Sequence, residues 1–202
     1  MKISHKNGKG NKIHLFIDGE YQITTNADFY AENYFYENSE ISEEEWQELV
    51  EKINYSKAVN KCFDLLSRRS HSVKELRDKL LKFFDSQTAD KAVNQMIEYG
   101  YLNDEEYAKE LFDYLLNTKK LSKRFIVLEM NKRGISSEIY DNLLASADID
   151  NVGTAFDIIT SKYLNKLSAE GGRQKVISAM VRKGFSYSDV CAALERLDYE
   201  DF

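Results

Sequence analysis

The sequence contains no proline, and it has only nine glycines and two cysteines among its 202 residues. Proline breaks helices and about ten would be expected at average usage, so its absence leaves helix interiors unbroken. No apolar run approaches the roughly 18 residues needed to cross a bilayer, and no apolar segment of a secretory signal opens the chain. We therefore expect a cytoplasmic protein with no membrane partner.

Residues that carry catalysis or bind metals are also scarce. The histidines His5, His14 and His71 share no metal-ligand spacing, and no Ser or Cys lies in a nucleophile pattern. Cys62 and Cys191 lie at helical positions among apolar neighbours, which is typical of buried reduced thiols. We therefore expect no catalytic residue, no metal and no cofactor.

The net charge of −6 is concentrated at one end of the chain. Residues 1–54 hold 5 Lys and Arg against 11 Asp and Glu, whereas residues 55–202 hold 23 of each sign. The acidic runs lie at predicted helix starts, where they complement the helix dipole. Any nucleic-acid binding must therefore come from local basic clusters rather than from the field of the whole protein.

One seven-residue pattern occurs twice with an offset of 50 residues. The segments 130–136 and 180–186 both read apolar–x–basic–basic–Gly–apolar–Ser, and Leu80 stands another 50 residues before Met130. The glycine is typical of the left-handed cap that ends a helix, and the serine can cap the next helix. A fixed period of this size indicates tandem repeats, although Phe83-Phe84 replace the basic residue and the glycine in the first copy.

We predict a mainly α fold, a tandem array of three three-helix repeats after an N-terminal β-hairpin and short helices. The domains are a hairpin with an acidic helical extension over 1–54, and helical repeats over 55–103, 104–150 and 151–202. Apolar residues at helical spacing mark three helices in each repeat. Because each repeat buries a small core and meets its neighbours at limited interfaces, we expect a curved or hinged array.

The N-terminal segment combines strand and helix signals. Asp18-Gly19 between two β-prone runs predicts a hairpin over 12–24, and residues 1–11 are polar and expected to be loose. A two-residue loop would leave apolar residues on both faces of the hairpin. Either the ribbon is covered on both sides or the loop is longer than two residues. An aromatic-rich helix is expected over 28–36.

Capping boxes mark two further helix starts. Ser42 with Glu45, and Ser72 with Glu75, have the spacing at which side chains and backbone N–H groups cap each other. The first repeat begins near Ser56, so we expect one helix before this residue and another after it.

Basic clusters are the remaining candidates for function. They comprise Arg68, Arg69, Lys119, Lys120, Lys123, Arg124, Lys132, Arg133, Arg173, Lys175, Arg182 and Lys183. All lie at predicted helix ends or turns, where each can simply satisfy a helix dipole. Their recurrence favours a shared face that neutralises phosphates or meets an acidic partner. Five aromatic residues could stack on bases, although helical spacing assigns most of them to the core: Tyr99, Tyr101, Tyr107, Phe112 and Tyr114.

Residues 65–76 are similar to a signature around R-x-S-x-x-E-L, residues 100–108 are close to G-Y-L-(N/D)-D-x-x-(F/Y)-A, and residues 126–135 end in basic–basic–Gly–Ile. In this order and spacing, the three segments resemble motifs of the RecX family, the small regulators of RecA recombinase. The resemblance covers residues from about 56 to 200, and the N-terminal hairpin and acidic helix look like the extension of some members. One departure is the segment 116–122, where the family usually has Arg and Gly.

The resemblance implies tandem three-helix repeats in a cytoplasmic protein. It implies binding to RecA filaments on single-stranded DNA, along the filament groove, and modulation of strand exchange and ATP hydrolysis, usually inhibition. These activities belong to DNA repair, recombination and the SOS response, and the resemblance brings no catalytic residue. Because the repeats are neutral overall, we expect only weak or indirect contact with single-stranded DNA, and the filament as the main target of a monomer.

Two other hypotheses stay open. The middle and third helices of a repeat could form a helix-turn-helix nucleic-acid binder that acts independently of RecA and discriminates duplex sequences. A helical scaffold for another protein would bind neither DNA nor RecA. We favour the regulator that bridges RecA protomers, with the basic pairs at helix ends in contact with filament acids or DNA phosphate.

Overall fold

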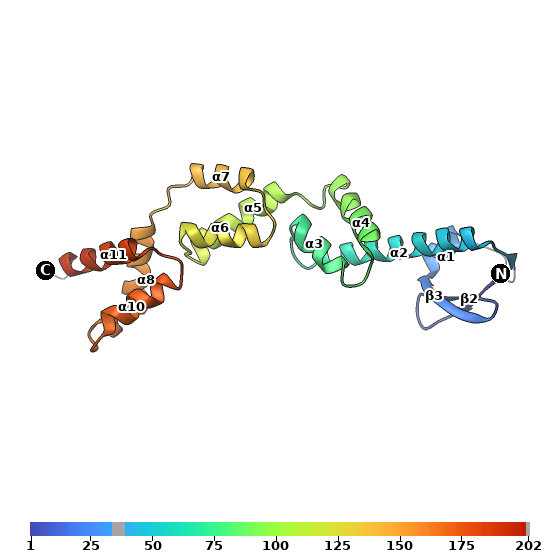
Figure 1. Cartoon of the computed structure of the whole chain (residues 1–202), viewed down its shortest axis with the longest axis horizontal. Coiled ribbons are helices and arrows are strands. Elements are labelled where there is room, and N and C mark those ends of the chain that lie inside the picture. The colour runs from blue at the N-terminus through green and yellow to red at the C-terminus, as the bar shows by residue number, and fades with distance from the viewer. Residues whose placement is uncertain (34–38, 201–202) are drawn as a thin grey trace. The chain divides into compact units, whose positions relative to one another are not determined.

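The computed structural model describes residues 1–33 and 39–200, and it is mainly α-helical with a small antiparallel sheet near the N-terminus (Figure 1). The predicted fold class is confirmed. The chain forms two compact units, Met1–Leu102 and Asn103–Phe202, and each contains two hydrophobic clusters. Within the described residues, no helix has the length and apolar character needed to cross a bilayer.

The sheet of the first unit is larger than the predicted hairpin. It contains β1 Lys2–Asn7, β2 Lys12–Ile17, β3 Glu20–Asn26 and β4 Ser39–Glu40, in the order β3-β2-β1-β4. The expectation that residues 1–11 are loose is wrong, because β1 pairs with β2 on one side and β4 on the other, and Ile3 is buried. A polar strand with paired backbone groups needs few apolar residues, and its partner β4 comes from far along the chain.

The hairpin loop has two residues, and a bulge decides which face is buried. Asp18 and Gly19 both have positive φ, as this tight turn requires. Leu15 pairs with Ile23 but Phe16 pairs with Tyr21, so Gln22 is an extra residue in β3. The bulge lets Ile23 pack with the buried face while Tyr21 stays 57% exposed. One face of the hairpin is buried and the loop has two residues, so neither alternative expected from the sequence applies.

Three longer helices follow the sheet in the first unit. The short helix α1 Ala27–Glu32 precedes them, and residues 34–36 of the predicted aromatic helix lie outside the described residues. α2 Glu43–Leu66, α3 Val73–Leu80 and α4 Ser86–Glu98 form the first three-helix segment. α2 runs without a break past Ser56, so one helix replaces the two that we expected there. It packs against the sheet through Trp46 and Ile53 and against α3 and α4 through Ala58 and Cys62.

Both predicted capping boxes are present. The side chain of Ser72 accepts the N–H of Glu75 at 3.1 Å, and the Ser42 side chain accepts the N–H of Glu45 at the same distance. Cys62 of α2 is fully buried in the core that α2 forms with α3 and α4. Burial raises the pKa of its thiol to about 11, so the thiol stays protonated.

The second unit contains two further three-helix segments. The first comprises α5 Asp104–Asp113, a π-helical turn over Tyr114–Thr118, α6 Lys123–Lys132 and α7 Ser137–Ser146. The second comprises the three longer helices α8 Asn151–Lys162, α10 Gly172–Val181 and α11 Tyr187–Glu200, with the short α9 Leu164–Leu167 between α8 and α10. The middle helices α6 and α10 insert Met130 and Met180 into their cores, and both side chains are fully buried.

The duplicated pattern forms the same turn after both middle helices. Gly134 and Gly184 have φ values of 76° and 89°, in the left-handed region predicted for a helix-ending glycine. The following N–H groups, of Ile135 and Phe185, donate back to the carbonyls of Met130 and Met180 at 3.1 and 3.3 Å. The serines differ. Ser186 accepts the N–H of Asp189 at 3.0 Å, whereas Ser136 occupies the cap position without a side-chain hydrogen bond.

Candidate functional site

The basic candidates differ in whether they form an ion pair with a carboxylate. Five are ion-paired: Arg68 with Asp64 at 2.8 Å, Arg69 with Glu75 at 3.2 Å, Lys120 with Asp157 at 3.2 Å, Arg173 with Asp198 at 2.9 Å, and Arg133 with Glu129. Hydrogen bonds from Lys61 and Arg68 lower the pKa of Asp64, which keeps this carboxylate charged. These five cations have structural partners, and an anionic ligand would have to compete for them.

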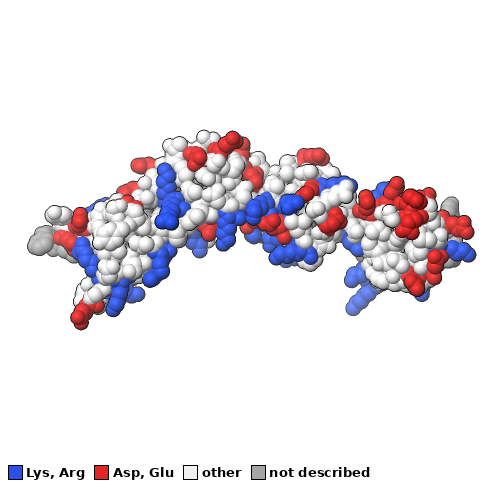
Figure 2. Space-filling view, viewed as in Figure 1, with Lys and Arg blue, Asp and Glu red and all other residues white. Residues whose placement is uncertain are grey.

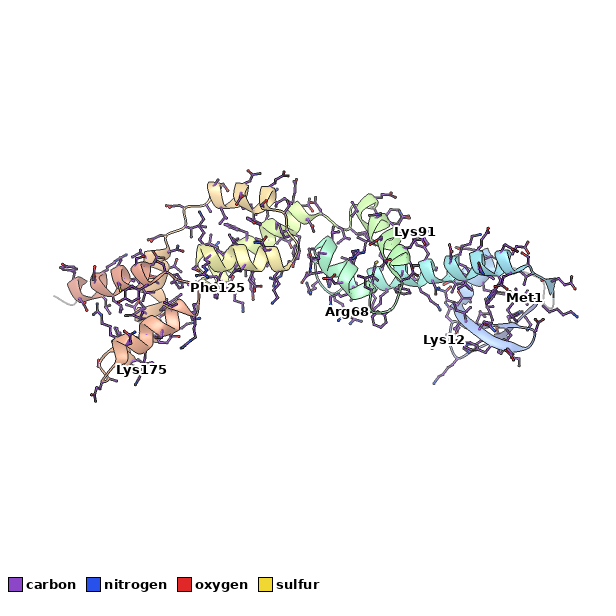
Figure 3. The ribbon with its side chains drawn as sticks, viewed as in Figure 1. Met1, Lys12, Arg68, Lys91, Phe125 and Lys175 are labelled. Carbon is purple, nitrogen blue, oxygen red and sulfur yellow. The ribbon has the colours of Figure 1, made fainter. Side chains whose placement is uncertain are left out.

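Two other basic pairs meet at one place in the second unit. Gly184, at the end of α10, approaches the start of α6 so closely that an added Cβ would lie 2.2 Å from Cδ1 of Phe125. The same Cβ would lie 2.6 Å from Oγ of Ser122. Figure 3 labels Phe125 at this end of α6. Lys123-Arg124 lie between these two contact residues, and Arg182-Lys183 directly precede Gly184, so residues about sixty positions apart in sequence converge here.

We call these four residues, Lys123, Arg124, Arg182 and Lys183, the basic junction. None of them has a carboxylate ion-pair partner within the described part of the chain. Three are exposed and Lys183 is half-buried. On the face drawn in Figure 2, Lys and Arg gather along the lower edge of this unit over α6 and α10, while Asp and Glu gather over α7.

The helix dipole adds to the positive potential of the basic junction. Lys123 and Arg124 occupy the first turn of α6, which contains no acidic residue. The N-terminus of a helix carries a partial positive charge, so cations there are unfavourable unless an anion is present. Only Lys123 and Arg124 have this position, because Arg182 and Lys183 follow the C-terminal end of α10. Together the four cations, which have no carboxylate partner among the described residues, can bind phosphate or carboxylate groups.

Contacts between the two three-helix segments hold the basic junction in place. The backbone N–H of Lys123 donates to Oδ1 of Asn151 at 3.2 Å, and the Lys120–Asp157 ion pair crosses the same boundary. Ser122 is buried and caps α6 by accepting the N–H of Phe125 at 3.4 Å. Lys120 has a φ of 50°, a left-handed conformation that is rare outside glycine. Glycine would adopt this conformation without strain.

Three more basic candidates lie outside both groups. The ammonium of Lys119 lies 5.4 Å from the centre of the Tyr114 ring. Lys132 is exposed at the far end of α6, and Lys175 is exposed in the first turns of α10, where Figure 3 labels it. They extend the charged surface along the two middle helices.

The prediction that most of the five aromatic residues belong to the core is wrong for three of them. Phe112 is buried and Tyr107 packs partly against the core, but Tyr99, Tyr101 and Tyr114 are exposed. Tyr99 and Tyr101 flank Gly100 after α4 has ended, so helical spacing no longer assigns their faces. Their rings stack edge-to-face at 6.3 Å, and Tyr101 meets Phe63 at 5.4 Å in the same way.

The other candidate site is a groove of about 500 Å³ in the first unit. It lies between α2 and α4, and its lining includes Glu48, Glu51, Lys52, Lys91 and Glu98. Its mixed charges and open form give no converging set of catalytic groups. Among the described residues, no three His, Cys, Asp or Glu side chains lie together as a metal site would require.

Comparison with known proteins identifies the family. The family described as "RecX, first three-helix domain" matches residues 58–96. The "Regulatory protein RecX" of Caldanaerobacter subterraneus subsp. tengcongensis is 33% identical over 190 residues, which cover 94% of this chain and 95% of that protein. The chain belongs to the RecX family. Its curated relatives are named regulatory proteins.

Two solved RecX structures are similar in fold. The "Crystal structure of regulatory protein RecX" has a TM-score of 0.64 at 18% identity and covers 93% of this chain and 96% of its own. The "Crystal structure of RecX from Lactobacillus salivarius" has a TM-score of 0.60 at 25% identity and covers 72% of this chain and 97% of its own. The similarity extends beyond the first three-helix segment, over most of the RecX chain.

Proposed function

We propose that this RecX-family protein binds RecA filaments on single-stranded DNA in the cytoplasm and inhibits their ATPase and recombinase activities. The observation that carries the proposal is the basic junction, where four cations without carboxylate partners in the described residues converge near the start of α6. Such a site needs an anionic partner, and a recombinase filament on DNA offers both phosphates and carboxylates. Membership of the RecX family supports RecA as that partner.

A binding mechanism is sufficient for this function. A ligand that prefers one state of the filament shifts its equilibrium without any chemical step. If all four cations of the basic junction neutralise phosphates, the logarithm of the binding constant should fall with the logarithm of salt concentration at a slope of roughly −3. Weak autonomous binding to DNA would follow, because residues 55–202 as a whole carry no net charge.

Charge reversal tests the assignment. The double variant Arg124→Glu with Arg182→Glu should weaken inhibition of RecA-catalysed ATP hydrolysis roughly tenfold or more and flatten its salt dependence. The control is Lys109→Glu with Lys162→Glu, which alters the net charge equally at exposed positions of the same unit. Inhibition by the junction variant at the wild-type level would overturn the site. A wild-type protein without any effect on RecA would overturn the function.

The helix-turn-helix alternative requires a different contact with DNA. In that alternative the third helix of a repeat reads the duplex and must lie against phosphates. α7 carries Glu138 and Asp141 and no Lys or Arg, so its charge opposes this contact. Titrations against labelled single-stranded DNA and against duplexes of different sequence, each with and without RecA, separate the hypotheses. RecA-independent binding with duplex sequence preference would favour the alternative.

A further inference from the structure

We propose that the exposed face of α6 docks on protein, on an acidic surface that offers an apolar pocket, and not on DNA. The proposal rests on the proposed function, since it assigns this contact to the recombinase protein within the filament. The basic junction can meet either component. The neighbouring face of α6 contains an additional feature that favours a protein partner.

That feature is Leu128, whose side chain is 52% exposed. The inward face of α6 is formed by Ile126 and Met130, which are fully buried. At 100° per residue, Leu128 lies on the side of α6 almost opposite to these two residues. It therefore takes no part in the core of its own segment, and its apolar surface meets water.

Cations flank Leu128 along the same face. Arg124 lies four residues before it and Lys132 four residues after it, which makes both of them its neighbours on the helix surface. Neither cation has an ion-pair partner among the described residues, and the nearby carboxylate of Glu129 pairs with Arg133. The face thus has an apolar centre and a charged rim, the arrangement found in protein interfaces.

The end of α10 continues this surface. Val181, the last residue of α10, is 45% exposed and directly precedes Arg182 of the basic junction. The close approach of Gly184 to Phe125 places this end of α10 at the start of α6. A second exposed apolar side chain therefore lies next to Arg182, at the end of α10 that approaches the start of α6.

The chemistry of this face points to protein. Phosphate contacts need only cations, and recognition of unpaired bases uses exposed aromatic rings. α6 contains one aromatic residue, Phe125, and it is half-buried beside Gly184. Exposed leucine and valine gain little from a phosphate backbone, but they gain from an apolar pocket. The surrounding cations require that the rim of this pocket be acidic.

The test removes the apolar group and leaves the charge unchanged. Leu128→Ser should weaken binding to RecA filaments roughly fivefold, with unchanged salt dependence and unchanged affinity for single-stranded DNA alone. Leu164→Ser is the matched control, because Leu164 is 46% exposed on α9 of the same unit. It should bind filaments as the wild type does, and both variants should keep the wild-type melting temperature.

Three results separate the proposals. Wild-type filament binding by Leu128→Ser overturns the docking face. A parallel loss of affinity for filaments and for DNA alone also overturns it, because the leucine would then serve nucleic acid. If the wild-type protein itself fails to bind filaments, the proposed function is refuted.

Discussion

The contact between Gly184 and Phe125 can be tested by adding one methyl group. Gly184→Ala places a Cβ where the nearest atom, Cδ1 of Phe125, is 2.2 Å away, and it does so at a φ of 89°. The methyl group therefore meets two separate penalties. One is the steric strain of a left-handed alanine, and the other is the clash with the start of α6.

The two penalties can be estimated separately. Left-handed strain costs about 1–2 kcal/mol for a residue with a Cβ, and overpacking of a well-packed contact costs about 1–3 kcal/mol more. Gly184→Ala should therefore lower the free energy of unfolding by about 2–5 kcal/mol. Gly171 is the control at the opposite end of the same helix, since it has a φ of 65° and no atom within 4 Å of its added Cβ. Gly171→Ala should cost only the strain.

Guanidinium denaturation followed by far-UV circular dichroism measures both losses. The difference between the two variants, about 1–3 kcal/mol, reports the close approach of α10 to α6. Equal losses would refute this reasoning, because they would show that α6 does not lie against Gly184. The basic junction would then lose the contact that brings its two halves together.

Two further predictions concern local conformation. Lys120→Gly should raise the free energy of unfolding by about 0.5 kcal/mol, because relief of left-handed strain exceeds the loss of the exposed ion pair with Asp157. A loss above 1 kcal/mol in denaturant titration would show that this pair dominates. Ser72→Ala should cost about 1–2 kcal/mol, whereas Ser136→Ala should change stability by less than 0.5 kcal/mol, because only Ser72 makes a side-chain cap. Thermal melts of both variants test this contrast, and equal shifts would contradict it.

Sequence spacing is sufficient to predict two of the ion pairs among the basic candidates. The pairs Arg68–Asp64 and Arg133–Glu129 are four residues apart on one helix, so both could be expected from the sequence alone. The partners of Lys120 and Arg173 are 37 and 25 residues away, and no local pattern indicates them. For that reason the sequence could list twelve basic candidates but could not separate the paired residues from the unpaired ones.

The same limit explains the errors in the N-terminal segment and among the tyrosines. β1 forms because β2 and β4 supply hydrogen-bond partners for its backbone. The polar sequence of residues 1–11 gives little local indication of a strand. Helical spacing places Tyr99 and Tyr101 in the core, but it no longer applies beyond the end of α4. Gly100, between the two tyrosines, is the residue that indicates this helix end.

By itself, the sequence determined the repeat and the helix ends of this RecX-family protein. A glycine at the end of a helix and a serine at the start of the next act through neighbouring backbone groups, so their effect is visible in a short segment. Tertiary packing brings the segment of Arg182-Lys183 to that of Lys123-Arg124, and it leaves Leu128 exposed. That convergence depends on packing between segments distant in sequence, where the missing side chain of Gly184 admits Phe125.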